Sequence, residues 1–151
     1  MPALPAIGGD NNIWGAELNA WLLVGHNPDG TNNLGNHTRS RVFPLLYPSG
    51  TFPLIVPLWR VPYSITITAI YVYRLGGTGA TLNARKLSAG VATTLLVSDF
   101  SATTTNPWVA AGSLAAGSTL AAGDSLEALV QSITGTPNYL AIQIDYLEPV
   151  A

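Results

Sequence analysis

The spacing of hydrophobic residues predicts one helix near the start of the chain. In residues 11–24 (NNIWGAELNAWLLV) the large apolar side chains recur three and four positions apart: Trp14, Leu18, Trp21 and Leu22. This spacing places them on one face of a short amphipathic helix. An isolated helix of this length is marginal in water, so we expect that face to be buried against the β region or a neighbouring subunit.

From residue 42 onward the pattern changes to that of β-strands. Short runs rich in Val, Ile, Thr, Tyr and Leu are separated by clusters of Gly, Pro and Ser at intervals of about ten residues. This spacing is typical of a β-sandwich or barrel. We predict strands over residues 42–46, 54–59, 64–74, 81–87, 93–97, 112–114, 125–132 and 139–147.

The last predicted strand has the clearest alternation. Its core face would consist of Leu140, Ile142, Ile144 and Tyr146, and the residues between them would form a more polar face. Proline cannot donate a hydrogen bond to a strand ladder, so the prolines of the earlier runs predict edges or bulges there. These prolines are Pro44, Pro53, Pro57 and Pro62. The central strands should therefore follow Tyr63.

Glycine clusters predict the turns. Gly76, Gly77 and Gly79 lie between two predicted strands, without the G-x-G-x-x-G pattern or the lysine of a phosphate-binding loop. We therefore predict a hairpin connection there. Three Ala-Ala-Gly tripeptides should mark successive turns further along the chain. They end at Gly112, Gly117 and Gly123.

The start of the chain has the composition of an extended arm. Residues 1–9 (MPALPAIGG) contain two prolines, two glycines and no charge, so they need another surface to order them. Leu4 and Ile7 are the apolar side chains that such a surface would cover. A polar loop follows the helix, so we predict arm, helix and loop over residues 1–41 and a β domain over residues 42–151.

Charged side chains are sparse, at 9% of the 151 residues, against roughly 25% in an average soluble domain. Either Ser, Thr and Asn supply a neutral polar surface, or much of the surface is buried against other copies or a larger assembly. A monomer of this mass exposes about 7,300 Å², so its 6 basic and 8 acidic residues would give roughly one charge per 500 Å². That area is about the size of the largest apolar patch on a typical monomer. We therefore favour the second explanation. The composition excludes intrinsic disorder and a basic nucleic-acid-binding face. We also expect neither a secretory leader nor a transmembrane segment.

Residues able to carry catalysis or bind metal form no recognisable pattern. His26 and His37 lack the spacing of a helical metal-binding pair, and the chain has no cysteine. No G-x-S-x-G motif marks a nucleophilic serine, and Asp99 and Asp124 lie where Asx turns are expected. We therefore predict no enzyme activity, catalytic residue, metal site or cofactor. Trp108 is the tryptophan that we expect to be exposed, and it is the candidate for surface binding.

Two parts of the chain resemble proteins of tailed-bacteriophage virions. In the β region, the segments SITITAIYVYRLGGTGATLNARKL, LAAGDSLEALV and YLAIQIDYLEP follow one another in that order. They resemble small jelly-roll domains of phage virion proteins. The preceding segment IGGDNNIWGAELNAWLLVGHNPDGT resembles one that is common in phage tail-fibre and related virion proteins.

The resemblance implies a bacteriophage virion structural protein, folded as an antiparallel jelly-roll sandwich preceded by an extended arm and one short helix. We expect a small capsid decoration (cement) protein that binds the particle surface as a homotrimer. Its partners would be its own copies and the major capsid protein or other virion proteins, with no nucleic acid and no membrane. It would be made in the host cytoplasm and located in the virion. The expected assembly contacts are Leu4, Ile7, Trp14, Leu18, Trp21 and Leu22.

An alternative is a tail-associated or tail-fibre module that recognises a glycan on the host surface. In that case, exposed aromatic side chains should lie beside Asn or Asp at the loop end of the sandwich.

Overall fold

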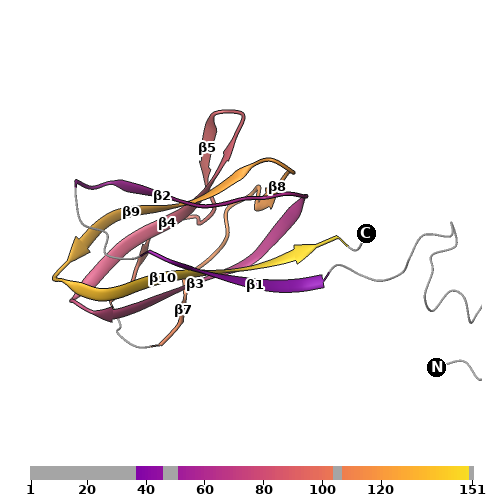
Figure 1. Cartoon of the computed structure of the whole chain (residues 1–151). Helices are drawn as coiled ribbons and strands as arrows, with labels where there is room; N and C mark the ends of the chain where they lie inside the picture. The colour runs from indigo at the N-terminus through magenta and orange to yellow at the C-terminus, as the bar shows by residue number, and fades with distance from the viewer. Residues whose placement is uncertain (1–36, 46–50, 104–106, 150–151) are drawn as a thin grey trace, which may run out of the picture. The chain divides into compact units, whose positions relative to one another are not determined.

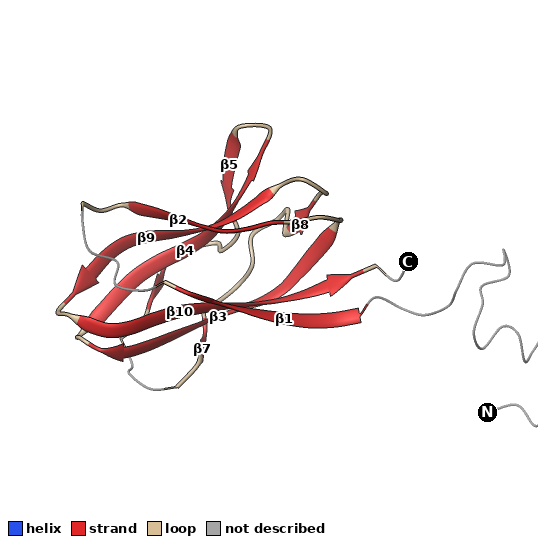
Figure 2. Ribbon diagram, viewed as in Figure 1, coloured by secondary structure: helices blue, strands red, loops and turns tan. Residues whose placement is uncertain are grey.

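The protein is mainly β, as predicted. The computed structural model describes residues 37–45, 51–103 and 107–149, and these form strands and loops without a helix (Figure 2). The strands are β1 His37–Pro44, β2 Leu54–Arg60, β3 Ile65–Gly76, β4 Gly79–Ser88, β5 Val91–Thr94, β6 Phe100–Ser101, β7 Val109–Ala110, β8 Thr119–Leu120, β9 Ser125–Thr134 and β10 Pro137–Glu148. The predicted arm over residues 1–9 and helix over residues 11–24 lie outside the described residues.

The strands form two antiparallel sheets that pack face to face. The order in the first sheet is β1-β10-β3-β7, and β8 also pairs with β3. The order in the second sheet is β2-β9-β4-β5, and β6 also pairs with β4. Figure 1 shows the two layers, with β1, β10 and β3 in one and β2, β9 and β4 in the other. The long strands after Tyr63 occupy the central positions, as predicted.

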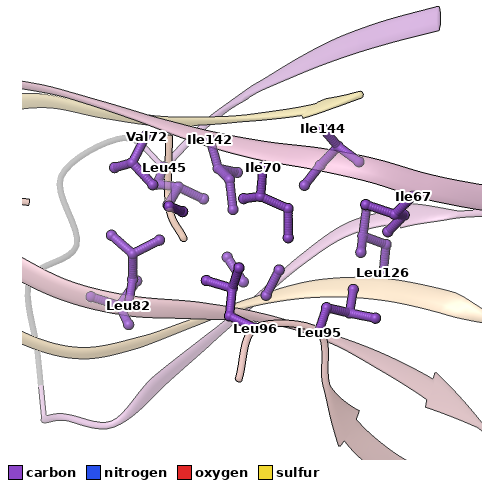
Figure 3. Close-up of a cluster of buried hydrophobic side chains, with 14 of the residues drawn as sticks. Leu45, Ile67, Ile70, Val72, Leu82, Leu95, Leu96, Leu126, Ile142 and Ile144 are labelled. Atoms are coloured by element: carbon purple, nitrogen blue, oxygen red, sulfur yellow. The ribbon is translucent and has the colours of Figure 1, made fainter. Parts of the chain in front are cut away.

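The core lies between the two sheets. Leu140, Ile142, Ile144 and Tyr146 are buried, which confirms the predicted alternation of the last strand. Apolar side chains of the two sheets point toward one another across the core (Figure 3). The first sheet contributes Ile67, Ile70, Val72, Ile142 and Ile144, and the second sheet and its loops contribute Leu82, Leu95, Leu96 and Leu126.

Prolines mark the edge strands, as predicted. β1 and β2 are the first strands of their sheets, and each is paired with a neighbour on one side only among the described residues. Pro44 ends β1, and the register of β2 with β9 shifts between Pro57 and Trp59. A residue without an N–H group is tolerated there because the edge needs no partner.

β1 begins at His37, so the strand predicted from residue 42 was placed too late. The segment HTRSR is polar and was predicted as loop. In the structure each residue of β1 has a partner in β10, from His37 opposite Glu148 to Pro44 opposite Ala141. Pairing with a long central strand stabilises these residues although their side chains are exposed. The compact unit accordingly runs from His37 to Pro149.

The strands at the opposite edge of the sandwich are short and interrupted. The prediction for residues 93–97 and 112–114 was wrong in extent, because Leu96 and Leu114 form only an isolated bridge. The amide of Ala115 also donates to the carbonyl oxygen of Leu95 at 2.8 Å. Residue 95 is itself hydrogen-bonded to β4 through Ala84, so these bonds join segments that belong to different sheets.

The turn predictions are confirmed at two of the three Ala-Ala-Gly tripeptides, which end in turns at Gly117 and Gly123. Gly112 also has a positive φ angle, but residues 111–113 form no turn. Asp124 caps the turn at Gly123, because its Oδ2 accepts the amide of Ala121 at 2.9 Å. Asp99 has a different role from the one predicted, since its Oδ1 accepts the side-chain amide of Asn83 at 2.8 Å and so attaches the loop to β4.

The glycine-rich link between β3 and β4 crosses from one sheet to the other, so the predicted hairpin was wrong. β3 pairs with β10, whereas β4 pairs with β9. The link runs beside the β9–β10 link, where the amide of Thr78 donates to the carbonyl of Thr134 at 2.9 Å. Gly77 has φ +64°, and a Cβ at this position would lie 2.8 Å from the backbone nitrogen of Pro137. Both its backbone conformation and the close approach require glycine.

Gly77→Ala should lower the free energy of unfolding by about 2 kcal/mol or more, since the added methyl group meets backbone atoms that cannot move aside. Gly90 provides the matched control. It also has a positive φ, but a Cβ there would meet nothing within 4 Å, so Gly90→Ala should cost only about 1 kcal/mol. Urea unfolding of both variants measures the difference. Equal losses would show that the approach to Pro137 is unimportant.

Candidate functional site

Trp108 is the one predicted site residue within the described part of the chain, and its side chain is 40% exposed, as expected for surface binding. The six predicted assembly contacts fall outside the described residues. They are Leu4, Ile7, Trp14, Leu18, Trp21 and Leu22. The prediction of their role therefore stays a prediction.

Trp108 belongs to an aromatic cluster on the outer face of the first sheet. Its ring centroid lies 5.4 Å from that of Tyr73, with the planes inclined by 47°. Tyr139 lies on the other side of Tyr73, with centroids 6.1 Å apart and planes inclined by 68°. Such tilted and edge-on pairs are favourable because the positive edge of one ring meets the negative face of the next. Tyr73, Trp108 and Tyr139 are called the aromatic cluster below.

The strand registers explain why these residues meet. Tyr139 of β10 is the partner of Leu75 in β3, and Ala141 of β10 is the partner of Tyr73. Residues two apart on a strand share a face, so Tyr73, Leu75, Tyr139 and Ala141 all lie on the outer side of the sheet. Sequence reasoning singled out Trp108 and missed the two tyrosines. The predicted alternation already gave both tyrosines outward positions. The pairing of β3 with β10, which brings them together, could not be read from the sequence.

Arg74 joins the end of β3 to the segment at residues 102–103. It points inward between outward-facing Tyr73 and Leu75, and it is almost completely buried. Its guanidinium donates to the carbonyls of Ala102 at 2.8 Å and Thr103 at 2.7 Å. It also donates to the carbonyls of Gly76 and Gly77. A planar group with five N–H donors can join several backbone segments in this way, so Arg74 fixes the β3–β4 link against the loop that leads toward Trp108.

The outer face of the second sheet has a different chemistry. Arg85 of β4 and Glu127 of β9 are register partners and form a salt bridge of 2.7 Å. Two residues away on β4, on the same face, the side-chain amide of Asn83 donates to Asp99, and the Oδ1 of Asn83 accepts the amide of Leu96 at 3.1 Å. Charged and amide groups of this face are thus used in internal contacts, whereas the aromatic cluster presents rings.

A second group of polar and aromatic side chains lies at the edge between β1 and β2. Arg41 of β1 is placed 4.3 Å from the ring centroid of Trp59 of β2, and the Trp59 ring lies 5.5 Å from that of Tyr146. The cation–π and ring contacts connect the two sheets. We call these three residues, together with Glu148 and its partners Tyr63 and Arg39, the edge cluster.

Glu148 completes the edge cluster. It accepts the hydroxyl of Tyr63 at 2.7 Å and the Nε of Arg39 at 3.0 Å. The hydrogen bond from Tyr63 and then that from Arg39 hold the pKa of Glu148 below its usual range. The hydrogen bond between Tyr63 and Glu148 also raises the pKa of Tyr63. A carboxylate kept ionised near neutral pH is suited to holding β1 and the chain near Tyr63 in place, and is poorly suited to acting as a general acid.

Within the described ranges, no three His, Asp or Glu side chains come close enough to hold a metal ion. The same residues contain no helical segment able to cross a bilayer. Asp124 also has a lowered pKa, because the Ser88 hydroxyl and the Ala121 amide donate to it.

Comparison of the chain with protein-family models, with curated proteins and with solved structures found no match.

Tyr63→Phe should raise the pKa of Glu148 toward its ordinary value, because the donor that contributes most to the shift is removed. The lowered pKa of Glu148 stabilises the folded protein at pH values above the pKa of the unfolded state, and this stabilisation is lost as the pH falls through the folded-state pKa. The raised pKa of Tyr63 stabilises the folded protein at pH values below the unfolded-state pKa, and this stabilisation is lost as the pH rises through the folded-state pKa. The stability difference between wild type and variant should thus be largest between about pH 5 and pH 10 and shrink on either side.

Thermal unfolding across this pH range, with an NMR titration of the Glu148 carboxyl, provides the measurement. A Tyr63→Phe variant whose Glu148 titrates as in the wild type would show that the hydrogen bond does not determine the shift.

Proposed function

We propose that the protein is a structural subunit of a tailed-bacteriophage virion, in which a jelly-roll domain decorates or cements the particle. The proposal rests on the resemblance of its β segments and N-terminal segment to phage virion proteins. Its main structural support is the order in which the strands pair. The charge distribution over the surface is an independent second support.

The strand pairing favours the jelly-roll because partners nest from the outside of the sequence inward. β1 pairs with β10 and β2 with β9, while β3 pairs with β7 and β8, and β4 with β5 and β6. Counting β5 with β6 and β7 with β8 as interrupted strands leaves eight strands in two sheets of four. This count and this order of pairing support a double-sheet jelly roll.

The distribution of charge supports an assembly role. All six Lys and Arg residues of the chain lie in the described part, and three of them, Arg39, Arg74 and Arg85, are paired with a carboxylate or buried. Arg74 is buried among carbonyls, Arg39 and Arg85 are in salt bridges, and Arg41 covers Trp59. The surface is therefore still more neutral than the composition indicates, and subunit interfaces are depleted in charged residues in the same way.

The alternative, a tail-associated or tail-fibre module that binds a host surface glycan, is favoured by one specific observation. The aromatic cluster lies at the end of the sandwich where β10 begins, and Asn138 is exposed beside Tyr139 there. This is the combination of aromatic and amide side chains that we expect of a glycan-binding module.

We expect a stable homotrimer in solution, because a neutral surface of this kind gains free energy when copies cover it. Light scattering after size exclusion, at micromolar protein concentration, should give about three times the chain mass of 15.8 kDa. A monodisperse monomer would contradict both the trimer and the explanation of the sparse charge.

Deletion of residues 1–9 should leave the melting temperature nearly unchanged and weaken binding to particles. Leu4 and Ile7 would contribute about 1.5 to 3 kcal/mol each if a partner covers them, and several copies acting together would multiply the effect. Co-sedimentation with empty capsids of the encoding phage measures the binding of the full chain and of the truncated chain. Equal binding of both, or loss of folding in the truncated chain, would contradict an attachment role for the arm.

A further inference from the structure

The outer face of the first sheet combines aromatic rings with neutral hydrogen-bonding groups. Beyond the aromatic cluster, the next row of this face holds Gln143 of β10 opposite Tyr71 of β3, and Asp145 follows on the same side of β10. The Nε2 of Gln143 donates to the Oδ1 of Asp145 at 2.9 Å. Rings at one end and amide, carboxylate and phenol groups further along thus share one sheet surface.

We propose that this surface is a carbohydrate-binding site for neutral pyranose units of a polysaccharide. The C–H groups of a pyranose carry partial positive charge and pack against the negative face of an aromatic ring. Its hydroxyl groups need donors and acceptors nearby. Trp108 offers the exposed ring, Tyr73 and Tyr139 support and extend it, and Gln143 supplies an amide group further along the same face of β10.

The length of the face indicates an oligosaccharide. Tyr139 and Gln143 are four positions apart on β10, which corresponds to about 13 Å along the strand. That distance exceeds a single sugar ring, so several consecutive units would lie along β10. Between the two ends, Ala141 lies opposite Pro44 of β1 and Tyr73 of β3 and is itself fully buried.

Charge restricts the ligand to neutral sugars. The basic side chains of the chain lie elsewhere: Arg39 and Arg41 are in the edge cluster, Arg74 is buried, and Arg60, Arg85 and Lys86 are on the second sheet. Besides the phenols of Tyr71, Tyr73 and Tyr139, the titratable group of this face among the described residues is Asp145, which is acidic. A uronic or sialic acid would therefore meet a like charge and no cation from the part of the chain that the structure describes.

The distribution of apolar groups favours a sugar over a protein partner. A stable protein interface covers about 800 Å² on each side, with a contiguous apolar centre. Here the exposed large apolar side chains are separated, since Leu75 and Trp108 lie at one end and Val42 lies at the β1 edge. The row of Tyr71 and Gln143 carries polar groups between them.

The experiment uses the full-length chain on an array of neutral and acidic glycans, followed by affinity gel electrophoresis in dextran, mannan, galactan and hyaluronate. We expect binding to a neutral glycan and none to hyaluronate. Trp108→Ala and Tyr73→Ala should each weaken binding at least tenfold, whereas Trp108→Phe should retain part of it. The matched control is Ile55→Ala, which removes a side chain of similar exposure, 45%, from the outer face of the second sheet.

The inference rests on the glycan-binding alternative given above and deepens it, and its failure can be told apart from failure of the virion decoration role. Absence of binding to every neutral glycan on the array would overturn it, while a trimer in light scattering would leave the structural role untouched. Preference for acidic glycans would overturn it as well. If Trp108→Ala dissociates the oligomer and leaves glycan binding unchanged, the face is a subunit contact instead.

Discussion

The structure depends above all on the pairing of β10 with two neighbours. Its residues from Ala141 to Glu148 pair with β1, and those from Pro137 to Leu147 pair with β3. A strand with neighbours on both sides has its backbone polar groups satisfied within the sheet. Its inward side chains then form the centre of the core. Its outward Tyr139 belongs to the aromatic cluster, and Tyr146 and Glu148 near its end belong to the edge cluster. This one strand therefore positions the core, the aromatic cluster and the edge cluster.

The two edges of the sandwich are closed by different interactions. At the edge of β1 and β2 the closing groups are side chains, with Arg41 over Trp59 and Glu148 bonded to Tyr63. At the opposite edge the closing groups are backbone amides and carbonyls around Leu96. Salt and pH act mainly on exposed charged side chains. The first edge should therefore respond to solution conditions and the second should not.

The way in which charge is used connects the fold with the proposed functions. Salt bridges, carbonyl contacts and turn caps occupy most charged groups of the described domain, so its outer faces carry mainly neutral polar and aromatic groups. Such a surface gains little from long-range attraction and depends on close contact, either with other subunits or with uncharged sugar rings. A cement role and glycan binding are compatible on one domain, since the first relies on multivalent burial and the second on a single sheet face.

The sequence by itself determined the class of the fold, the central and edge positions of the strands and the buried face of β10, because alternation and proline placement are local consequences of strand geometry. It also pointed to Trp108. It did not determine that the link at Gly77 crosses between sheets or that polar β1 begins at His37. Nor did it show that Tyr73 and Tyr139 lie beside Trp108. Those features follow from which strand pairs with which, and pairing is decided by contacts between residues far apart in the chain. Only the tertiary structure brings such residues to within a few ångströms of one another.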